Sequence, residues 1–260
     1  MQGTAGRQPG KPLVHPPLSQ VAFEVNFPNS FAVETEVAKY QQRVQELYPE
    51  SSAEYIVRLP TAVAFGKPPK HDSASLTPMR SFVFQNLQHS RVVRVSVVNF
   101  TFVVTDYLHF EDYLEALTAA IVPAIEIFQL RNTNRIGLRY INHIPLPVKG
   151  ADTEYQKYVR SPINVDFLSG HLPTSFLTEV SLDLGSAKGL TIRSGLLPAQ
   201  SDGSARTYLL DIDCFSPGQV ALSTQGIKQL LSDYHDAIET QFLRTITEPY
   251  LKHMAEGSAI

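Results

Sequence analysis

The residues best suited to binding chemistry lie in the run RIGLRYIN, residues 135–142. In a strand, side chains alternate between two faces, so Arg135 and Arg139 share one face and Asn142 lies on the other. Guanidinium groups bind phosphate and carboxylate through paired hydrogen bonds. The run therefore predicts a ligand- or partner-binding surface made by Arg135, Arg139 and Asn142. The alternative is structural, with Arg139 paired to an acidic residue on a neighbouring strand.

Two carboxylates, Asp211 and Asp213, also share one strand face in the run LLDIDCF. This spacing suits a divalent cation or an acid/base pair. No histidine or third carboxylate accompanies them in the sequence, so they are weak metal candidates. The expectation is that they are solvated or form salt bridges, with Arg193 or Arg206 opposite.

The single cysteine, Cys214, and His235 are the other reactive side chains near apolar segments. Cys214 has mostly apolar neighbours, which favours a buried, inert thiol over a nucleophile. His235 lies beside Tyr234 on the last predicted helix, with Glu239 one turn further on. We expect a core histidine whose polar atoms are satisfied, with a catalytic role as the alternative.

Familiar catalytic patterns are missing from the sequence. It contains no GxSxG, no P-loop, no GxGxxG after a strand and no zinc-ligand spacing. The prediction therefore leans away from an enzyme and expects no cofactor. Hydrolysis supported by Asp211 and Asp213 is the fallback.

Composition narrows the class of protein. The formal net charge of −3 argues against nucleic-acid binding, because such proteins usually carry a basic excess. No apolar run is long enough to span a membrane, and the first residues do not resemble a signal peptide. These features predict a cytoplasmic protein that makes no membrane contact.

Hydrophobic periodicity predicts the same element order twice. In the first half, a strand over 19–27 precedes a helix that Pro49 ends, three or four strands, and a helix over about 110–130. In the second half, a strand over 135–145 precedes a short helix or turn, three strands, and a helix that begins at a Ser223 N-cap and that Pro249 ends. We expect an α+β fold of two similar β-α-β(3–4)-α modules, which form curved antiparallel sheet with long helices on one face.

The predicted boundaries follow this order. Residues 1–18 are a flexible N-terminal tail, 19–132 the first module, 133–250 the second module and 251–260 a C-terminal tail. The alternatives are an unrelated α+β chain with coincidental order and a mixed two-domain protein.

If the modules are related, the strands over 19–27 and 135–145 are equivalent, and Glu24 takes the place of Arg139. The two side chains would then face each other across a pseudo-twofold axis at the sheet centre. This geometry makes Glu24 the predicted structural partner of Arg139.

Three runs, PLVHPPLSQVAFEVNFP, RIGLRYINHIPLP and YLLDIDCF, lie within residues 12–247. Together they resemble a sporadically distributed prokaryotic family of uncharacterised proteins that has an RIGLRYIN-type central motif. The opening departs from the family pattern by the extra residues 15–18. The resemblance implies no activity, but sporadic distribution is typical of defence, toxin-linked and mobile-element genes.

The leading functional hypothesis is a non-catalytic protein-interaction or scaffold component of a prokaryotic multi-protein system, and the resemblance implies a link to defence or mobile elements. Its partner would be another protein or a second copy of the chain, bound through strand edges. The first alternative is a sensor that binds a small anionic ligand between the modules through Arg135 and Arg139. The second is nucleic-acid binding on a saddle-like sheet.

Overall fold

The computed structural model describes residues 16–56, 79–146, 155–160, 173–198 and 206–256. Its strands are β1 (Leu18–Asn26), β2 (Glu50–Ile56), β3 (Met79–Gln85), β4 (Arg91–Ser96), β5 (Asn99–Val104), β6 (Arg135–Pro145), β7 (Thr178–Gly185), β8 (Lys188–Leu196) and β9 (Thr207–Pro217). Its helices are α1 (Ala32–Val44), α2 (Phe110–Ile127), α3 (Thr224–Thr245), α4 (Glu248–Glu256) and the short 3₁₀ helix η1 (Tyr155–Lys157).

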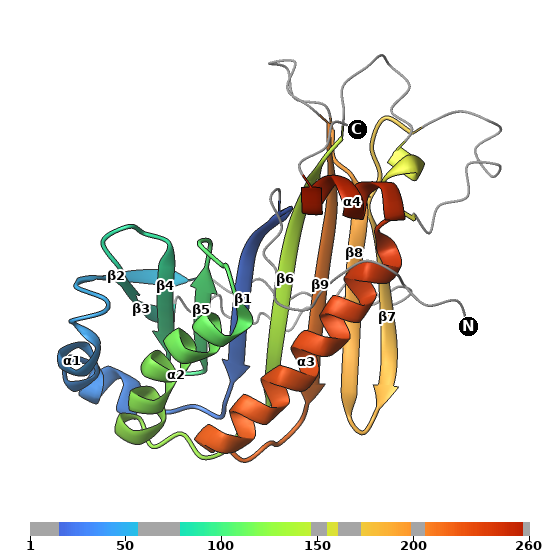
Figure 1. The fold of residues 1–260 in the computed structure, drawn as a ribbon. Helices are drawn as coiled ribbons and strands as arrows, with labels where there is room; N and C mark the ends of the chain where they lie inside the picture. Colours follow the sequence, from blue (N-terminus) through green and yellow to red (C-terminus); the bar gives the residue numbers. More distant parts are fainter. Residues whose placement is uncertain (1–15, 57–78, 147–154, 161–172, 199–205, 257–260) are drawn as a thin grey trace, which may run out of the picture.

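The nine strands of the described residues form one antiparallel sheet in the order β2-β3-β4-β5-β1-β6-β9-β8-β7 (Figure 1). The two central strands, β1 and β6, are the first strands of the two predicted modules. Strands β5 and β9, which flank this pair, continue outward through hairpins to β3 and β7. The fold is therefore α+β with a large antiparallel sheet, as the sequence predicts.

One face of the sheet forms the core. On β1, Val21, Phe23 and Val25 are fully buried, whereas Ala22 and Glu24 on the opposite face are only partly buried. Strict alternation of this kind is typical of a strand with one face packed on the core. The same alternation makes the second face of the sheet available for polar side chains.

Helices α1, α2 and α3 lie across the apolar face (Figure 1). Tyr40 on α1 packs against Phe84 of β3, with ring centroids 5.2 Å apart, and its hydroxyl donates to the Ala120 carbonyl on α2. Helix α3 packs on β6 and β9. Its predicted N-cap is confirmed, because the Ser223 hydroxyl accepts a hydrogen bond from the Gly226 amide.

The C-terminal segment corrects one sequence prediction. Residues 251–256 belong to α4, so the predicted tail over 251–260 is wrong there; residues 257–260 lie outside the described residues. Pro249 ends α3 as predicted, yet it also lies in the first turn of α4, where a missing amide N–H costs nothing. Tyr250 and Met254 are buried and anchor α4.

At the other end of the chain, residues 1–15 of the predicted N-terminal tail lie outside the described residues. Leu18 belongs to β1, and the Pro17 carbonyl accepts a hydrogen bond from the His143 amide at 2.8 Å, so the prediction of a flexible tail is wrong for these two residues. Within the described part of the chain, no helix is long and apolar enough to cross a membrane.

Candidate functional site

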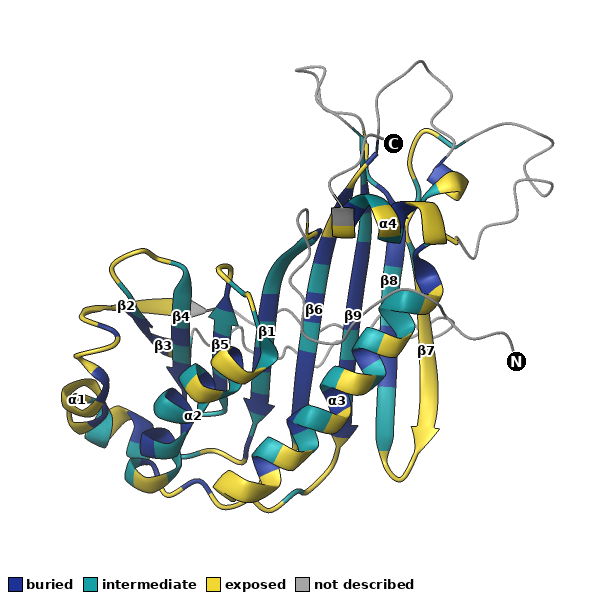
Figure 2. Ribbon diagram, viewed as in Figure 1, coloured by how far each residue is buried: buried dark blue, intermediate teal, exposed yellow. Residues whose placement is uncertain are grey.

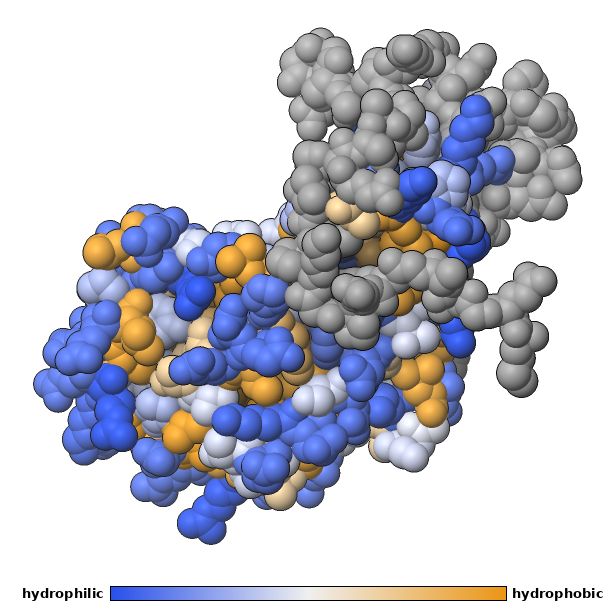
Figure 3. Space-filling model, in the orientation of Figure 1, coloured by the Kyte–Doolittle hydropathy of each residue, from blue (hydrophilic) through white to orange (hydrophobic). Residues whose placement is uncertain are grey.

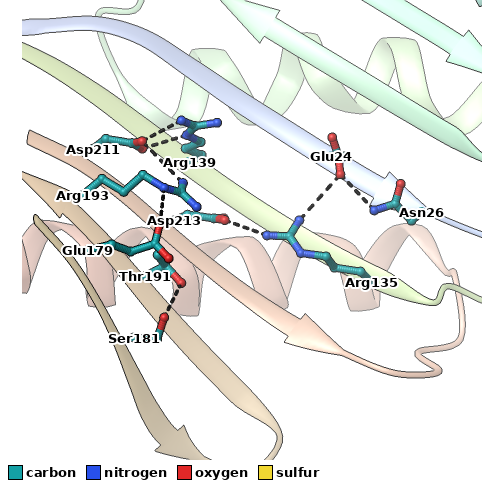
Figure 4. A network of polar contacts seen from close by, with 10 residues as sticks. All are labelled: Glu24, Asn26, Arg135, Arg139, Glu179, Ser181, Thr191, Arg193, Asp211 and Asp213. Atoms are coloured by element: carbon teal, nitrogen blue, oxygen red, sulfur yellow. Dashed lines mark hydrogen bonds and ion pairs between the residues drawn. The ribbon is translucent and has the colours of Figure 1, made fainter. Parts of the chain in front are cut away.

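A network of charged side chains crosses the face of the sheet opposite the helices (Figure 4). The alternation that buries Leu138 and Tyr140 on β6 places Arg135 and Arg139 on this open face. On β9, the same alternation places Asp211 and Asp213 on the open face. We call this the charged network, and its members are Glu24, Arg135, Arg139, Glu179, Arg193, Asp211 and Asp213.

Asp211 is the buried centre of the network, with only 3% of its side chain exposed. Arg139 forms a bidentate pair with Asp211, in which Nε donates to Oδ1 at 2.7 Å and Nη2 donates to Oδ2 at 2.6 Å. Arg193 approaches from β8, with Nη1 3.6 Å from Oδ2. The hydrogen bond to Asp211 raises the pKa of Arg139, although partial burial opposes the shift. Two guanidinium groups therefore compensate one buried carboxylate.

Arg135 forms a second centre. Its Nη2 lies 2.7 Å from Oδ2 of Asp213, and its guanidinium group lies 4.8 Å from the centroid of the Phe215 ring. Burial raises the pKa of Asp213, while the neighbouring Arg135 lowers it, and the net shift is upward. Gly137 makes room for this arrangement, because a Cβ there would come within 2.9 Å of Nη1 of Arg135.

The predicted pair of Glu24 and Arg139 is corrected by the strand register. Glu24 lies opposite Gly137, and Arg139 lies opposite Ala22. Arg139 therefore pairs with Asp211, while Glu24 lies 3.8 Å from Arg135 and accepts a hydrogen bond from Asn26. Only the register between β1 and β6 decides which arginine Glu24 reaches.

The network nearly neutralises itself. At its far end, Arg193 donates to Glu179 of β7 at 2.6 Å. Three guanidinium groups face four carboxylates, which leaves one net negative charge when all are ionised. The arginines expected to clamp an anion are thus already engaged by carboxylates.

Asn142 does not join these arginines. It is buried, and its side-chain amide donates to the Leu210 carbonyl at 3.0 Å, so it links β6 to β9 inside the core. The sequence places it on the face opposite Arg139, and the structure agrees with that placement.

The remaining reactive residues lie in structural surroundings. Cys214 is buried, and burial raises the pKa of its thiol to about 12. His235 stacks on Phe110 with ring centroids 4.2 Å apart, and its Nδ1 lies 2.9 Å from the hydroxyl of Tyr140. That hydroxyl also contacts the hydroxyl of Tyr107 at 3.1 Å, a link between distant segments that the sequence does not reveal. Among the described residues, no group of three or more potential ligands could hold a metal ion.

The most unusual surface belongs to the edge strand β7, which is exposed along nearly its whole length (Figure 2). Val180 and Leu182 point to the helix-covered face, and Leu184 follows them at a register shift next to the turn; the three side chains are 40%, 40% and 43% exposed. We call these three side chains the β7 stripe. In the space-filling view, apolar surface gathers near the end of this edge (Figure 3).

The stripe is exposed because no helix in the described part of the chain lies over β7. Leu182 pairs with Leu190 of β8, which is buried at 3% exposure. In the other half of the sheet, α1 shields the equivalent outer position, and Phe84 of β3 is buried under Tyr40. The sequence shows the alternation of β7 but not that its apolar face lacks a cover.

No family model matches the chain, and no curated protein matches it significantly.

Proposed function

We propose that this chain is a non-catalytic protein-interaction or scaffold component of a prokaryotic multi-protein system, and that β7 is its docking edge. The single observation that supports this most is the uncovered β7 stripe on an edge strand. An edge strand presents unpaired backbone N–H and C=O groups, and an added strand satisfies them while its side chains cover the stripe.

The charged network favours a structural role for the open face of the sheet. It joins β7 through β8, β9 and β6 to β1 by ion pairs, and its charges are compensated internally. A network of this kind orients strands without offering a free cation to a ligand. It thus favours a rigid platform over a catalytic centre.

Two related modules, over 19–132 and 133–250, belong to the same proposal. In the register of β1 and β6, Phe23 lies opposite Leu138, and both are buried. Around this pair, Glu24 and Arg139 lie at equivalent positions, each opposite a small residue. Placement in the cytoplasm and a link to defence or mobile elements come from the sequence and its resemblance alone.

The sensor alternative depends on Arg135 and Arg139. A small anion would have to compete with Asp213 and Asp211 for them. Thermal-shift screening with nucleotides and other anionic metabolites tests it, since a ligand that binds only the folded state raises the melting temperature. A rise that Arg135→Met and Arg139→Met both abolish would favour the sensor over the scaffold.

The docking edge is tested by affinity capture with the full chain as bait and the products of neighbouring genes as candidates. Leu182→Lys should lose the captured partner, because it places a charge in the centre of the stripe. Tyr55→Lys is the matched control, since Tyr55 is an exposed side chain on the opposite edge strand, β2. If no candidate is captured and the chain does not associate with itself either, or if all three baits capture the candidate equally, the docking proposal is wrong.

A further inference from the structure

We propose that the occupant of β7 is a second copy of the same chain, paired antiparallel to the first in a register centred on Leu182. This inference rests on the proposed function, since it takes β7 to be a docking edge, and it adds the identity and geometry of the partner.

The two faces of β7 limit how a second copy of the strand can pair with it. In antiparallel pairing, residues directly opposite each other point to the same side of the sheet. A register centred on Leu182 therefore sets Leu182 against Leu182 of the second copy, and Val180 against Leu184 in both directions. Each side chain of the β7 stripe then lies opposite a stripe side chain of the second copy, and the helices of both copies lie on the same side of the joined sheet. A slip of one residue would set the stripe against polar side chains.

The acidic residues on the other face of β7 favour the same register. The other face of β7 presents Glu179, Ser181 and Asp183. In the register centred on Leu182, Glu179 lies opposite Gly185, and Asp183 lies opposite Ser181. A register centred on Ser181 would place Glu179 directly opposite Asp183 twice, and like charges so placed are destabilising. Glu179 is also compensated within its own copy by Arg193, at 2.6 Å.

The two edge strands of the sheet, β2 and β7, differ in how well they suit pairing. Strand β2, with the sequence ESSAEYI, presents Glu50 and Glu54 among serines, and Glu54 pairs with Arg94 of β4. Charges and polar residues of this kind protect an edge from pairing. Neither strand contains a lysine or a proline, and each carries two acidic residues, but β7 places Val180 and Leu182 on the helix-covered face where β2 places Ser51, Ala53 and Tyr55. Self-pairing is therefore expected at β7 and not at β2.

The hairpin geometry permits this pairing. Ser186 and Ala187 have positive φ angles and form the turn between β7 and β8, just beyond the last pair of the hairpin, Gly185 and Lys188. The proposed register extends from Glu179 to Gly185, so the turn of each copy lies beyond the paired segment. The dimer would join two nine-stranded sheets edge to edge into one continuous sheet.

Sedimentation velocity on the full chain tests the pairing at concentrations from about 1 to 100 µM, the range in which a small edge interface should associate. The 28.9 kDa chain should shift from monomer to dimer over this range. Leu182→Lys sets two like charges opposite each other and should weaken association about tenfold or more. Tyr55→Lys on β2 should associate like the wild type. Circular dichroism and melting curves should match for all three, since Leu182 and Tyr55 are exposed in the monomer.

Cysteine crosslinking tests the register itself. Leu182→Cys should form an interchain disulfide under mild oxidation, because the two copies of residue 182 are directly opposite. Val180→Cys alone should not, because its two copies would lie about 13 Å apart along the strand. Val180→Cys combined with Leu184→Cys should crosslink again. The native Cys214 is buried and does not compete.

The outcomes separate this inference from the proposed function. A wild-type chain that stays monomeric at every concentration overturns the second copy as occupant. If that monomer still captures another protein, and Leu182→Lys loses it, the docking edge stands with a different partner. A dimer that Leu182→Lys leaves intact, or crosslinking through Val180→Cys alone, shows that the chain associates in another way and also overturns the inference.

Discussion

At the scale of single residues, burial decides what each ion pair contributes. Asp211 and Glu54 both accept a hydrogen bond from the Nε of an arginine, and Arg139 and Arg94 are almost equally exposed, at 42% and 43%. The carboxylates differ, since Asp211 is 3% exposed and Glu54 46%. A charge left without its partner is costly only where water cannot replace that partner. The two pairs therefore make a matched comparison within one protein.

Arg139→Met should destabilise the fold, because it removes the bidentate partner of a buried carboxylate. We expect a loss of about 2 kcal/mol, below the usual range for a broken buried pair because Arg193 remains near Asp211. Arg94→Met should cost under about 1 kcal/mol, as exposed pairs do. Urea unfolding of both variants measures the difference. Equal losses would show that Arg139 is not structural and would revive its role as a ligand clamp.

Asp213 should give the stability a distinct dependence on pH. Burial raises its pKa in the folded state above its ordinary value of 3.8, so the folded state binds a proton at a higher pH than the unfolded state does. Between these two pKa values, the wild type should gain stability relative to Asp213→Asn as the pH falls. Urea unfolding of both proteins from pH 7 to about pH 3.5 measures this difference. A wild type that instead loses stability relative to Asp213→Asn on acidification would contradict the upward shift.

Cys214 should be unreactive in the folded protein. Burial raises the pKa of its thiol to about 12, so thiolate is scarce at pH 8, and the sulfur is also shielded from solvent. Its reaction with a disulfide reagent should follow the unfolding rate. A rapid reaction that leaves the native circular dichroism unchanged would point to an accessible thiol.

At the scale of elements, α4 is a helix that the sequence pattern does not predict, because Pro249 looks like the end of the helical region. Pro249 interrupts the periodicity of α3, and the sequence after it looks too short and polar to pack. The structure places Tyr250 and Met254 in the core, so α4 is a packed element. A short helix is stabilised mostly by tertiary contacts, which local sequence does not contain.

Met254→Ala should therefore lower the free energy of unfolding by about 2 to 4 kcal/mol, as expected for a fully buried side chain. Ala255→Arg on the exposed side of α4 is the control and should change it by less than about 0.5 kcal/mol. Urea unfolding provides both values. A negligible effect of Met254→Ala would mean that α4 is only loosely attached.

At the scale of the whole molecule, the two halves differ mainly at their outer ends. In one half, Tyr40 of α1 covers Phe84 of β3 while the edge strand β2 is exposed, and in the other half no helix among the described residues covers β7. The charged network extends from β7 to the central strand β1, so the proposed docking edge is continuous with the middle of the sheet. This asymmetry is the reason the proposed function is assigned to β7.

The sequence alone determined the α+β class, the alternation of β1 and β6, the capped start of α3 and the shared face of Arg135 and Arg139, because these depend on local periodicity and capping. Tertiary structure decided that Arg139 binds Asp211 and that Glu24 reaches Arg135, since register between distant strands sets those pairs. It also decided that the β7 stripe is exposed. A strand's pattern shows that it has an apolar face, but only the packing of the whole chain determines whether that face is covered.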